Sequence, residues 1–135
     1  MSESQIREQA AAFFDEFVDA FGSFDGKQIA LRYDVPYLAR HANGSCEVFD
    51  SGERIAGYFQ RIVDGYHGRD CRACRYNDLE ALPLGRDAML GTVTWELLRG
   101  DVSVLASWRE SYGLARSEGR LKILVSIDHA GQAFE

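Results

Sequence analysis

The chain has 135 residues, of which 46% are hydrophobic and 27% are charged, and its formal net charge at pH 7 is -6. This length fits one domain, residues 1–135, with a single hydrophobic core. Its basic residues are scattered among acids along the chain, which argues against nucleic-acid and anionic-membrane partners, because both bind clustered Lys and Arg.

The first predicted element is an amphipathic helix that begins at Ser2 and ends at Gly22. Ser2 with Gln5 resembles a capping box, and Gly22 is a typical helix end. The polar N-terminus is unlike a signal peptide, and no apolar run approaches the roughly 20 residues of a membrane span, so we expect a cytoplasmic protein without a membrane partner. The apolar stripe of this helix consists of Ile6, Ala10, Phe13, Phe14, Phe17, Val18 and Phe21.

A second, short helix is predicted after Asp25, which forms a further capping box with Gln28. Pro36 prevents its continuation and favours extended backbone. Two short strands follow at 37–41 and 46–49, and the turn sequence NGS separates them.

A third helix is predicted from the N-cap Ser51 to the glycines at 65 and 68. The sequence CRAC follows at Cys71 and Cys74. A zinc site needs about four ligands, and a thioredoxin-like motif should open a helix rather than lead into a strand. With Cys46 the cysteines are odd in number, which fits a reducing compartment. We therefore expect structural cysteines, with no metal and no cofactor.

In the rest of the chain apolar and polar residues alternate. This pattern predicts long strands at 72–82, 88–99, 102–116 and 120–129. Each connection carries a glycine that suits a hairpin. Strands of this length must twist and bend strongly. The predicted fold is therefore an α+β domain, with three N-terminal helices packed on a strongly curved antiparallel sheet.

This order of elements, with the sequences RYDVPYLARHANGSCEVFDSGERIAGYF and GRLKILVSIDHAG, resembles the nuclear transport factor 2-like superfamily. The resemblance is closest to a poorly characterised bacterial subgroup of its SnoaL-like branch, and it covers nearly the whole chain. It implies a cystatin-like, cone-shaped fold that encloses a pocket and is often a homodimer. The superfamily contains isomerases, cyclases, dehydratases, epoxide hydrolases and non-enzymes, so membership leaves the activity open.

Two-residue turns at Gly100–Asp101 and Glu118–Gly119 would fix the register of the last three strands. They place Trp95 opposite Ala106 and Glu110 opposite Ile127. An inner, apolar face follows, with Met89, Gly91, Val93, Trp95, Trp108, Tyr112, Leu114, Ile123, Val125 and Ile127. The polar, outer face would hold Thr92, Thr94, Glu96, Ser107, Arg109, Ser111, Lys122, Ser126 and Asp128. Two cross-strand ion pairs are expected on the outer face, Arg109 with Asp128 and Arg75 with Glu96.

Two polar groups, Glu110 and His129, fall on the apolar face as diagonal neighbours. A carboxylate among aromatic rings would be desolvated, which raises its pKa toward the range useful for acid–base catalysis. We therefore predict Glu110 and His129 as candidate catalytic residues. The structural alternatives are an ion pair between Glu110 and Arg116, a β-bulge that turns Glu110 outward, and a solvent-exposed His129 near the chain end.

Strand alternation places Tyr37 and His41 on one side of the first strand, which the resemblance puts at the pocket rim. Tyr37 could equally be a packed aromatic and His41 a surface residue. The predicted pocket residues are Tyr33, Tyr37, His41, Tyr58, Trp95, Trp108 and Tyr112.

Known enzymes of the superfamily use residue sets that do not map onto this chain. The ketosteroid-isomerase type has an aspartate base where this chain has Tyr37, Ala39 and His41. Our leading hypothesis is a small-molecule-binding protein that could act as a cofactor-independent isomerase, cyclase or dehydratase. The alternative is a non-catalytic homodimeric module that binds a ligand or partner.

Overall fold

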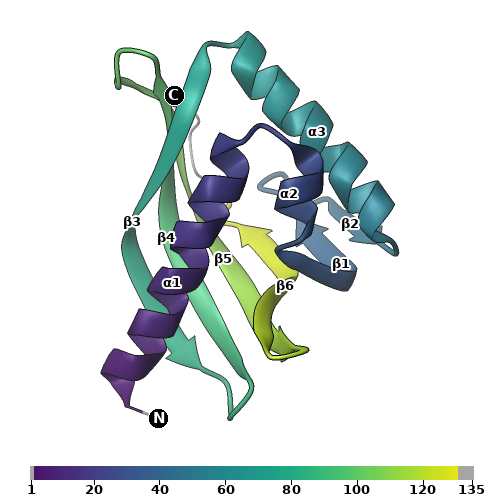
Figure 1. The fold of residues 1–135 in the computed structure, drawn as a ribbon, viewed down its shortest axis with the longest axis vertical. Coiled ribbons are helices and arrows are strands. Elements are labelled where there is room, and N and C mark those ends of the chain that lie inside the picture. The colour runs from purple at the N-terminus through teal and green to yellow at the C-terminus, as the bar shows by residue number, and fades with distance from the viewer. Residues whose placement is uncertain (1, 131–135) are drawn as a thin grey trace.

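The computed structural model describes residues 2–130, which form three helices and one six-stranded sheet (Figure 1). The helices are α1 (Glu3–Gly22), α2 (Gly26–Ala30) and α3 (Gly52–Gly68). The strands are β1 (Tyr33–Arg40), β2 (Cys46–Phe49), β3 (Cys71–Pro83), β4 (Ala88–Arg99), β5 (Val104–Ser117) and β6 (Arg120–Asp128). The α+β prediction is confirmed.

The strands lie in the order β2-β1-β6-β5-β4-β3 in one curled sheet. Figure 1 shows α1 along the inner face of the sheet beside β3 and β4, with α2 and α3 on the same side beside β1 and β2. The sheet was expected to be antiparallel, but β1 pairs with β6 in parallel. A parallel pair needs a long crossover connection, and the chain from β2 to β5 provides one.

The phenylalanine stripe of α1 forms the centre of the core. Phe14 and Phe17 are almost completely buried, and Phe17 meets the Trp95 ring edge to face at 5.5 Å. Phe14 fits because β4 has a glycine below it. A Cβ atom on Gly91 would lie 2.9 Å from Phe14 Cε2. Gly91 therefore brings the helix and the sheet close together.

The predicted N-cap residues are present, but the predicted capping box of Asp25 with Gln28 is not formed. Ser2 and Gln5 form a reciprocal capping box, Asp25 accepts from the amide of Lys27, and Ser51 accepts from the amide of Arg54. Each cap satisfies an amide that the first turn leaves without a helical partner.

The register of β4 and β5 differs from the prediction by two residues. Trp95 lies opposite Trp108 rather than Ala106, because residues 100–103 form a longer loop and the register shifts at Leu98. A shift of two residues leaves every side chain on its predicted face, because the side chains of a strand alternate with a period of two. The inner face of β4 and β5 was therefore predicted correctly.

The predicted register of β5 and β6 contains an error that places side chains on the wrong face of the sheet. Leu114 pairs with Ile123 as predicted, but Gly113 pairs with Val125, so Leu124 is an extra residue on β6. This β-bulge changes the alternation from Leu124 onward. The prediction that Val125 and Ile127 face inward was therefore wrong.

Within residues 2–130, no helix has the length and apolar character needed to cross a bilayer. The three cysteines, Cys46, Cys71 and Cys74, are unpaired.

Candidate active site

The inner face of the sheet and the helices enclose a cavity of about 100 Å³. Aromatic side chains form most of its wall, and the polar groups gather at β1, β5 and β6. All seven residues predicted from the sequence lie around it, namely Tyr33, Tyr37, His41, Tyr58, Trp95, Trp108 and Tyr112.

Hydrogen bonds between side chains fix the polar atoms of the wall. Trp95 Nε1 donates to the Tyr112 hydroxyl over 2.7 Å. The hydroxyls of Tyr37 and Ser126 are 2.5 Å apart, and both residues are buried. Burial raises the pKa of Tyr37, so its hydroxyl stays protonated and can donate a hydrogen bond.

Two carboxyl groups face each other across β5 and β6. Glu110 and Asp128 are directly opposed in the register, and both line the cavity. Trp108 Nε1 donates to Glu110 Oε1 over 2.9 Å, which holds this carboxyl group in position. The cavity therefore contains a carboxyl pair, defined here as Glu110 and Asp128.

The environment keeps a proton on the carboxyl pair. Burial, followed by repulsion from Asp128, raises the pKa of Glu110 from 4.5 to about 8, while hydrogen bonds from Trp108 and Tyr112 act in the opposite direction. Burial also raises the pKa of Asp128, which the hydrogen bond with Glu110 opposes. Two close carboxylates repel each other, so one of them stays protonated. We assign the proton to Glu110, because burial is the main cause of its raised pKa, whereas the nearby His41 and His129 lower the pKa of Asp128.

His41 lies at the cavity wall and is bound to β2. Its Nε2 is 2.9 Å from Glu47 Oε1, and its ring centre is 6.5 Å from that of Tyr58. The imidazole therefore has a hydrogen-bond partner outside the cavity, which orients it next to the polar end of the cavity.

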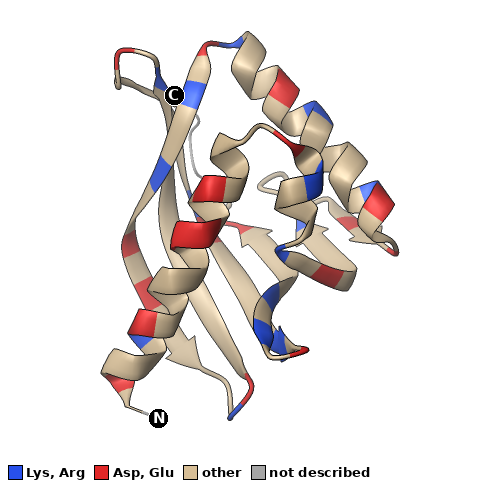
Figure 2. Ribbon diagram, viewed as in Figure 1, with Lys and Arg blue, Asp and Glu red and all other residues tan. Residues whose placement is uncertain are grey.

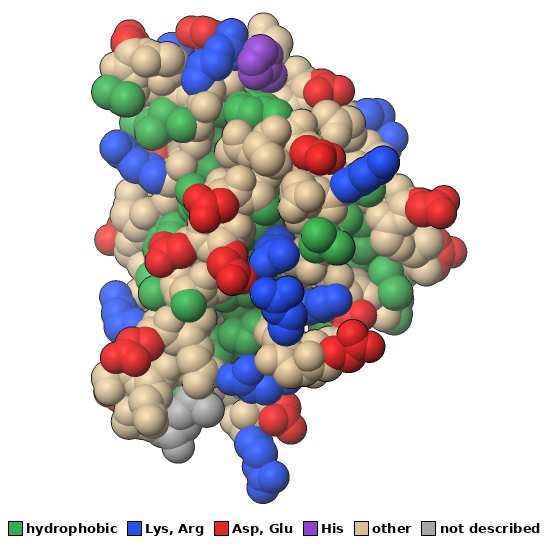
Figure 3. All heavy atoms as spheres, in the orientation of Figure 1, with side chains coloured by type: hydrophobic (Ala, Val, Ile, Leu, Met, Phe, Trp, Pro, Cys, Tyr) green, Lys and Arg blue, Asp and Glu red, His purple; other side chains and the backbone are tan. Residues whose placement is uncertain are grey.

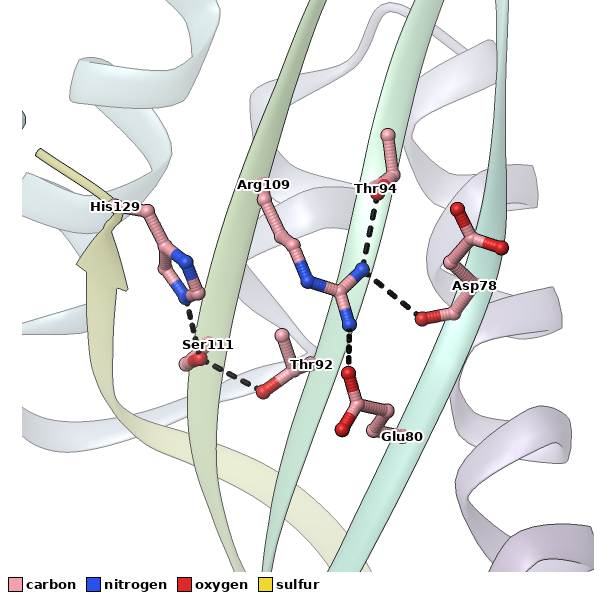
Figure 4. Close-up of polar contacts among 7 residues, drawn as sticks. All are labelled: Asp78, Glu80, Thr92, Thr94, Arg109, Ser111 and His129. Atoms are coloured by element: carbon pink, nitrogen blue, oxygen red, sulfur yellow. Dashed lines mark hydrogen bonds and ion pairs between the residues drawn. The ribbon is translucent and has the colours of Figure 1, made fainter. Parts of the chain in front are cut away.

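His129 does not lie where the sequence predicted. Figure 4 shows it on the other face of the sheet, where its Nε2 is 2.9 Å from Ser111 Oγ. Ser111 in turn contacts Thr92 Oγ1 at 2.7 Å. The pairing of Glu110 with His129 was wrong, because the bulge at Leu124 turns Asp128 inward and leaves His129 outside.

Arg109 also has different partners from those predicted. It forms an ion pair with Glu80 and donates over 3.0 Å to Thr94 Oγ1 and to the carbonyl of Asp78, all on the outer face (Figure 4). The expected ion pair with Asp128 was wrong, because the bulge at Leu124 turns Asp128 to the inner face of the sheet. The predicted ion pair of Arg75 with Glu96 is confirmed at 2.8 Å.

Sequence reasoning missed several residues of the cavity lining, among them the polar Ser126 and Asp128. Alternation alone placed these two on the outer face. Gly113 carried the only available signal, because a glycine inside a strand often marks a bulge. A Cβ atom there would lie 2.5 Å from Val125 Cγ1, so a larger residue would collide with Val125 at the bulge.

Comparison with known proteins agrees with this fold. Residues 7–131 match the family described as NTF2-like protein (DUF6841). No curated protein gives a significant match. Among solved structures, Aln2 from a Streptomyces species superposes with a TM-score of 0.77 at 12% identity, covering 96% of this chain and 94% of that one.

Two further structures show the same fold. An NTF-2 like protein of unknown function from Shewanella oneidensis MR-1 has a TM-score of 0.71 at 11% identity, over 91% of this chain and 98% of that one. A proposed dehydratase of the NTF2-like family from Streptomyces avermitilis has a TM-score of 0.68 at 12% identity, over 98% of this chain and all of that one. At these identities the likeness establishes the fold alone.

Proposed function

The chain belongs to this NTF2-like family, and we propose that it binds a small, largely apolar molecule in the aromatic cavity and transfers protons on it. The observation that carries the proposal is the carboxyl pair. A protonated Glu110 beside an ionised Asp128 provides an acid and a base at one place, within an apolar wall.

The chemistry that fits this pair is proton abstraction next to a carbonyl group. Asp128 would accept the proton from the carbon, while Glu110 would donate its proton to the carbonyl oxygen, so that an enol forms. A hydroxy ketone would form an enediol. Asp128 would then return its proton to the other carbon while that carbon's hydroxyl gives its proton to Glu110, which yields an isomer. Where the substrate has a β-hydroxyl group, this group would instead leave as water with the proton held by Asp128, and the enol hydroxyl would return its proton to Glu110, which yields an unsaturated ketone. Tyr37 could donate a further hydrogen bond to the oxygen that gains charge.

The cavity favours an uncharged substrate. Asp128, the one ionised acid of the carboxyl pair, disfavours an anion beside it, and the aromatic wall favours rings or short apolar chains. At about 100 Å³ it is smaller than the roughly 300–1,000 Å³ of pockets for drug-sized ligands. We therefore propose a small ketone or hydroxy ketone as the substrate class.

Hydrogen exchange in D₂O tests the proposal without knowledge of the natural substrate. A panel of small cyclic and aromatic ketones is incubated with the protein, and NMR follows deuterium uptake next to the carbonyl. Glu110→Gln and Asp128→Asn should each slow the exchange by about 10²–10⁴-fold. Glu8→Gln, which removes an exposed acid from α1, is the matched control and should leave the rate unchanged. Equal exchange rates in the wild type and all three variants would contradict the proposal.

A second candidate is non-catalytic binding of a small molecule, which the small volume of the cavity favours. Under this alternative a ketone would shift the NMR signals of cavity residues without any catalysed exchange. The same experiment therefore separates the two candidates.

We also propose that two copies associate through an apolar patch on the outer face of β2, β1 and β6. Val48 lies opposite Leu38 and is 58% exposed, while Leu38 and Ile127 are each 39% exposed. A two-fold dimer buries the same patch on both copies. Exposed apolar residues on three neighbouring strands support this arrangement.

A further inference from the structure

A second concavity, of about 230 Å³, lies away from the aromatic cavity. It is formed by α1, the connection from α2 to β1, and the β5–β6 hairpin, and we call it the arginine groove. Its basic residues are Arg32, Arg116 and Arg120, and its acid is Glu16. Figure 2 shows the Lys and Arg positions on the hairpin and beside α2, and Figure 3 shows basic side chains gathered in the middle of this face.

The three arginines come from segments far apart in the sequence, and the fold brings them together. The whole chain has a net charge of -6, so this grouping does not reflect a generally basic surface. With one glutamate against three arginines, the lining of the groove has two excess positive charges. Like charges that line one groove repel one another, and a bound anion would relieve the repulsion.

Within residues 2–130, the three arginines of the groove use only part of their hydrogen-bond donors. Arg32 donates from one terminal nitrogen to Glu16 over 2.9 Å, while its Nε is buried without a partner. Arg116 donates to the side-chain oxygen of Gln9 over 2.6 Å and has no carboxylate partner among residues 2–130. Arg120, exposed at the start of β6, has no side-chain partner in that part of the chain.

The backbone that carries two of the three arginines is held by the fold. The amide of Ile123 donates to the Arg32 carbonyl over 2.9 Å, which ties the α2–β1 connection to β6. The amide of Arg116 donates to the Asp87 carbonyl over 2.9 Å, which ties the end of β5 to the β3–β4 turn. The groove thus presents planar, forked donors from backbone that is already ordered, and such donors suit carboxylate and phosphate oxygens.

We propose that the arginine groove is a binding site for a small oxyanion, either a phosphate or a carboxylate group. The groove and the aromatic cavity share no lining residue, so this proposal does not depend on the proposed function. The two sites also differ in charge, since the groove has three arginines against one glutamate, whereas the cavity lining has two acids against one arginine.

The test is an NMR titration of the full chain with inorganic phosphate, and separately with sodium acetate, with sodium chloride added to keep the ionic strength constant. The expected result is a saturable shift of the amide signals near Arg32, Arg116 and Arg120 with at least one of the two anions. Comparison of the two titrations shows which oxyanion is preferred.

Two variants and one control complete the test. Arg116→Gln and Arg120→Gln each remove one charge-assisted donor from an exposed position and should weaken the binding about tenfold. Arg61→Gln removes an exposed arginine from α3, outside the groove, and should not change the affinity. If neither anion gives a saturable shift, or if Arg61→Gln weakens binding as much as the two groove variants, the proposal is overturned.

Discussion

Glu110 on β5 and Asp128 on β6 lie directly opposite each other, with both carboxyl groups on the wall of one aromatic cavity. A bulge at Leu124 produces this arrangement, because it turns the C-terminal part of β6 over by one residue. The chemistry proposed for this protein therefore depends on an irregularity of the sheet.

The raised pKa of Glu110 predicts how stability changes with pH. The folded protein keeps a proton that the unfolded chain loses near pH 4.5, so the free energy of unfolding should fall as the pH rises from about 4.5 to about 8. The slope is at most about 1.4 kcal/mol per pH unit for one proton. Glu110→Gln should remove this slope, which urea unfolding at several pH values measures. Glu8→Gln should keep it, and a slope shared by wild type and Glu110→Gln would contradict the assignment.

Asp128→Asn should lower the pKa of Glu110, because repulsion by Asp128 is the second largest cause of its raised value. Burial remains, so the pKa should stay above its ordinary value of 4.5. Carbon-detected NMR of the side-chain carboxyl can follow this titration. His129→Gln serves as the control from the opposite face of the sheet. A larger effect from His129→Gln than from Asp128→Asn would rule out the carboxyl pair as described.

Gly113→Ala should destabilise the protein by about 1–3 kcal/mol, because the new methyl group would collide with the side chain of Val125. Val125 is β-branched and cannot easily turn away. Thermal or urea unfolding measures the loss. Gly65→Ala is the matched control, since a Cβ atom there meets open space on α3, and it should stabilise by about 0.5–1 kcal/mol. A neutral Gly113→Ala would show that the bulge does not need this glycine.

Tyr37→Phe should cost about 1–3 kcal/mol, because it leaves the buried hydroxyl of Ser126 without its observed partner. In the double variant, Ser126→Ala should lower the free energy of unfolding little further, because the two hydroxyls bond to each other. Urea unfolding of the wild type, the two single variants and the double variant gives the coupling energy. Strictly additive losses would mean that the two hydroxyls do not stabilise each other.

Val48→Glu should separate the proposed dimer into monomers, because two copies of the charge would meet in or beside an apolar interface. Sedimentation velocity measures the mass of the particle. Glu53→Lys, on the exposed first turn of α3, controls for a general effect of changed charge and should leave the mass unchanged. If the wild type already sediments as a monomer at high concentration, the dimer proposal fails.

The sequence alone predicted most of the fold, and the reasons are local. The stripe of phenylalanines, the capping residues Ser2, Asp25 and Ser51, and the alternation of the later strands each depend on neighbours a few residues away. Even the shifted register of β4 and β5 left the predicted faces unchanged, because the shift was by an even number of residues.

The polar part of the cavity was predicted only in part. Glu110 lies on a strand whose alternation is regular as far as Gly113, so its inward position could be inferred. Asp128 and Ser126 lie beyond the bulge, where counting from the hairpin turn gives the wrong face. A bulge depends on the packing of two strands against each other, here Gly113 against Val125, and one sequence gives only a weak sign of it.

The sequence by itself determined the three helices, the long, bent sheet and the aromatic interior, because residue periodicity and helix capping act over short distances along the chain. Only the tertiary structure decided that Asp128 meets Glu110 and that three scattered arginines share one groove. Those contacts join residues from separate elements, so they exist only after the strands have paired and the helices have packed on them.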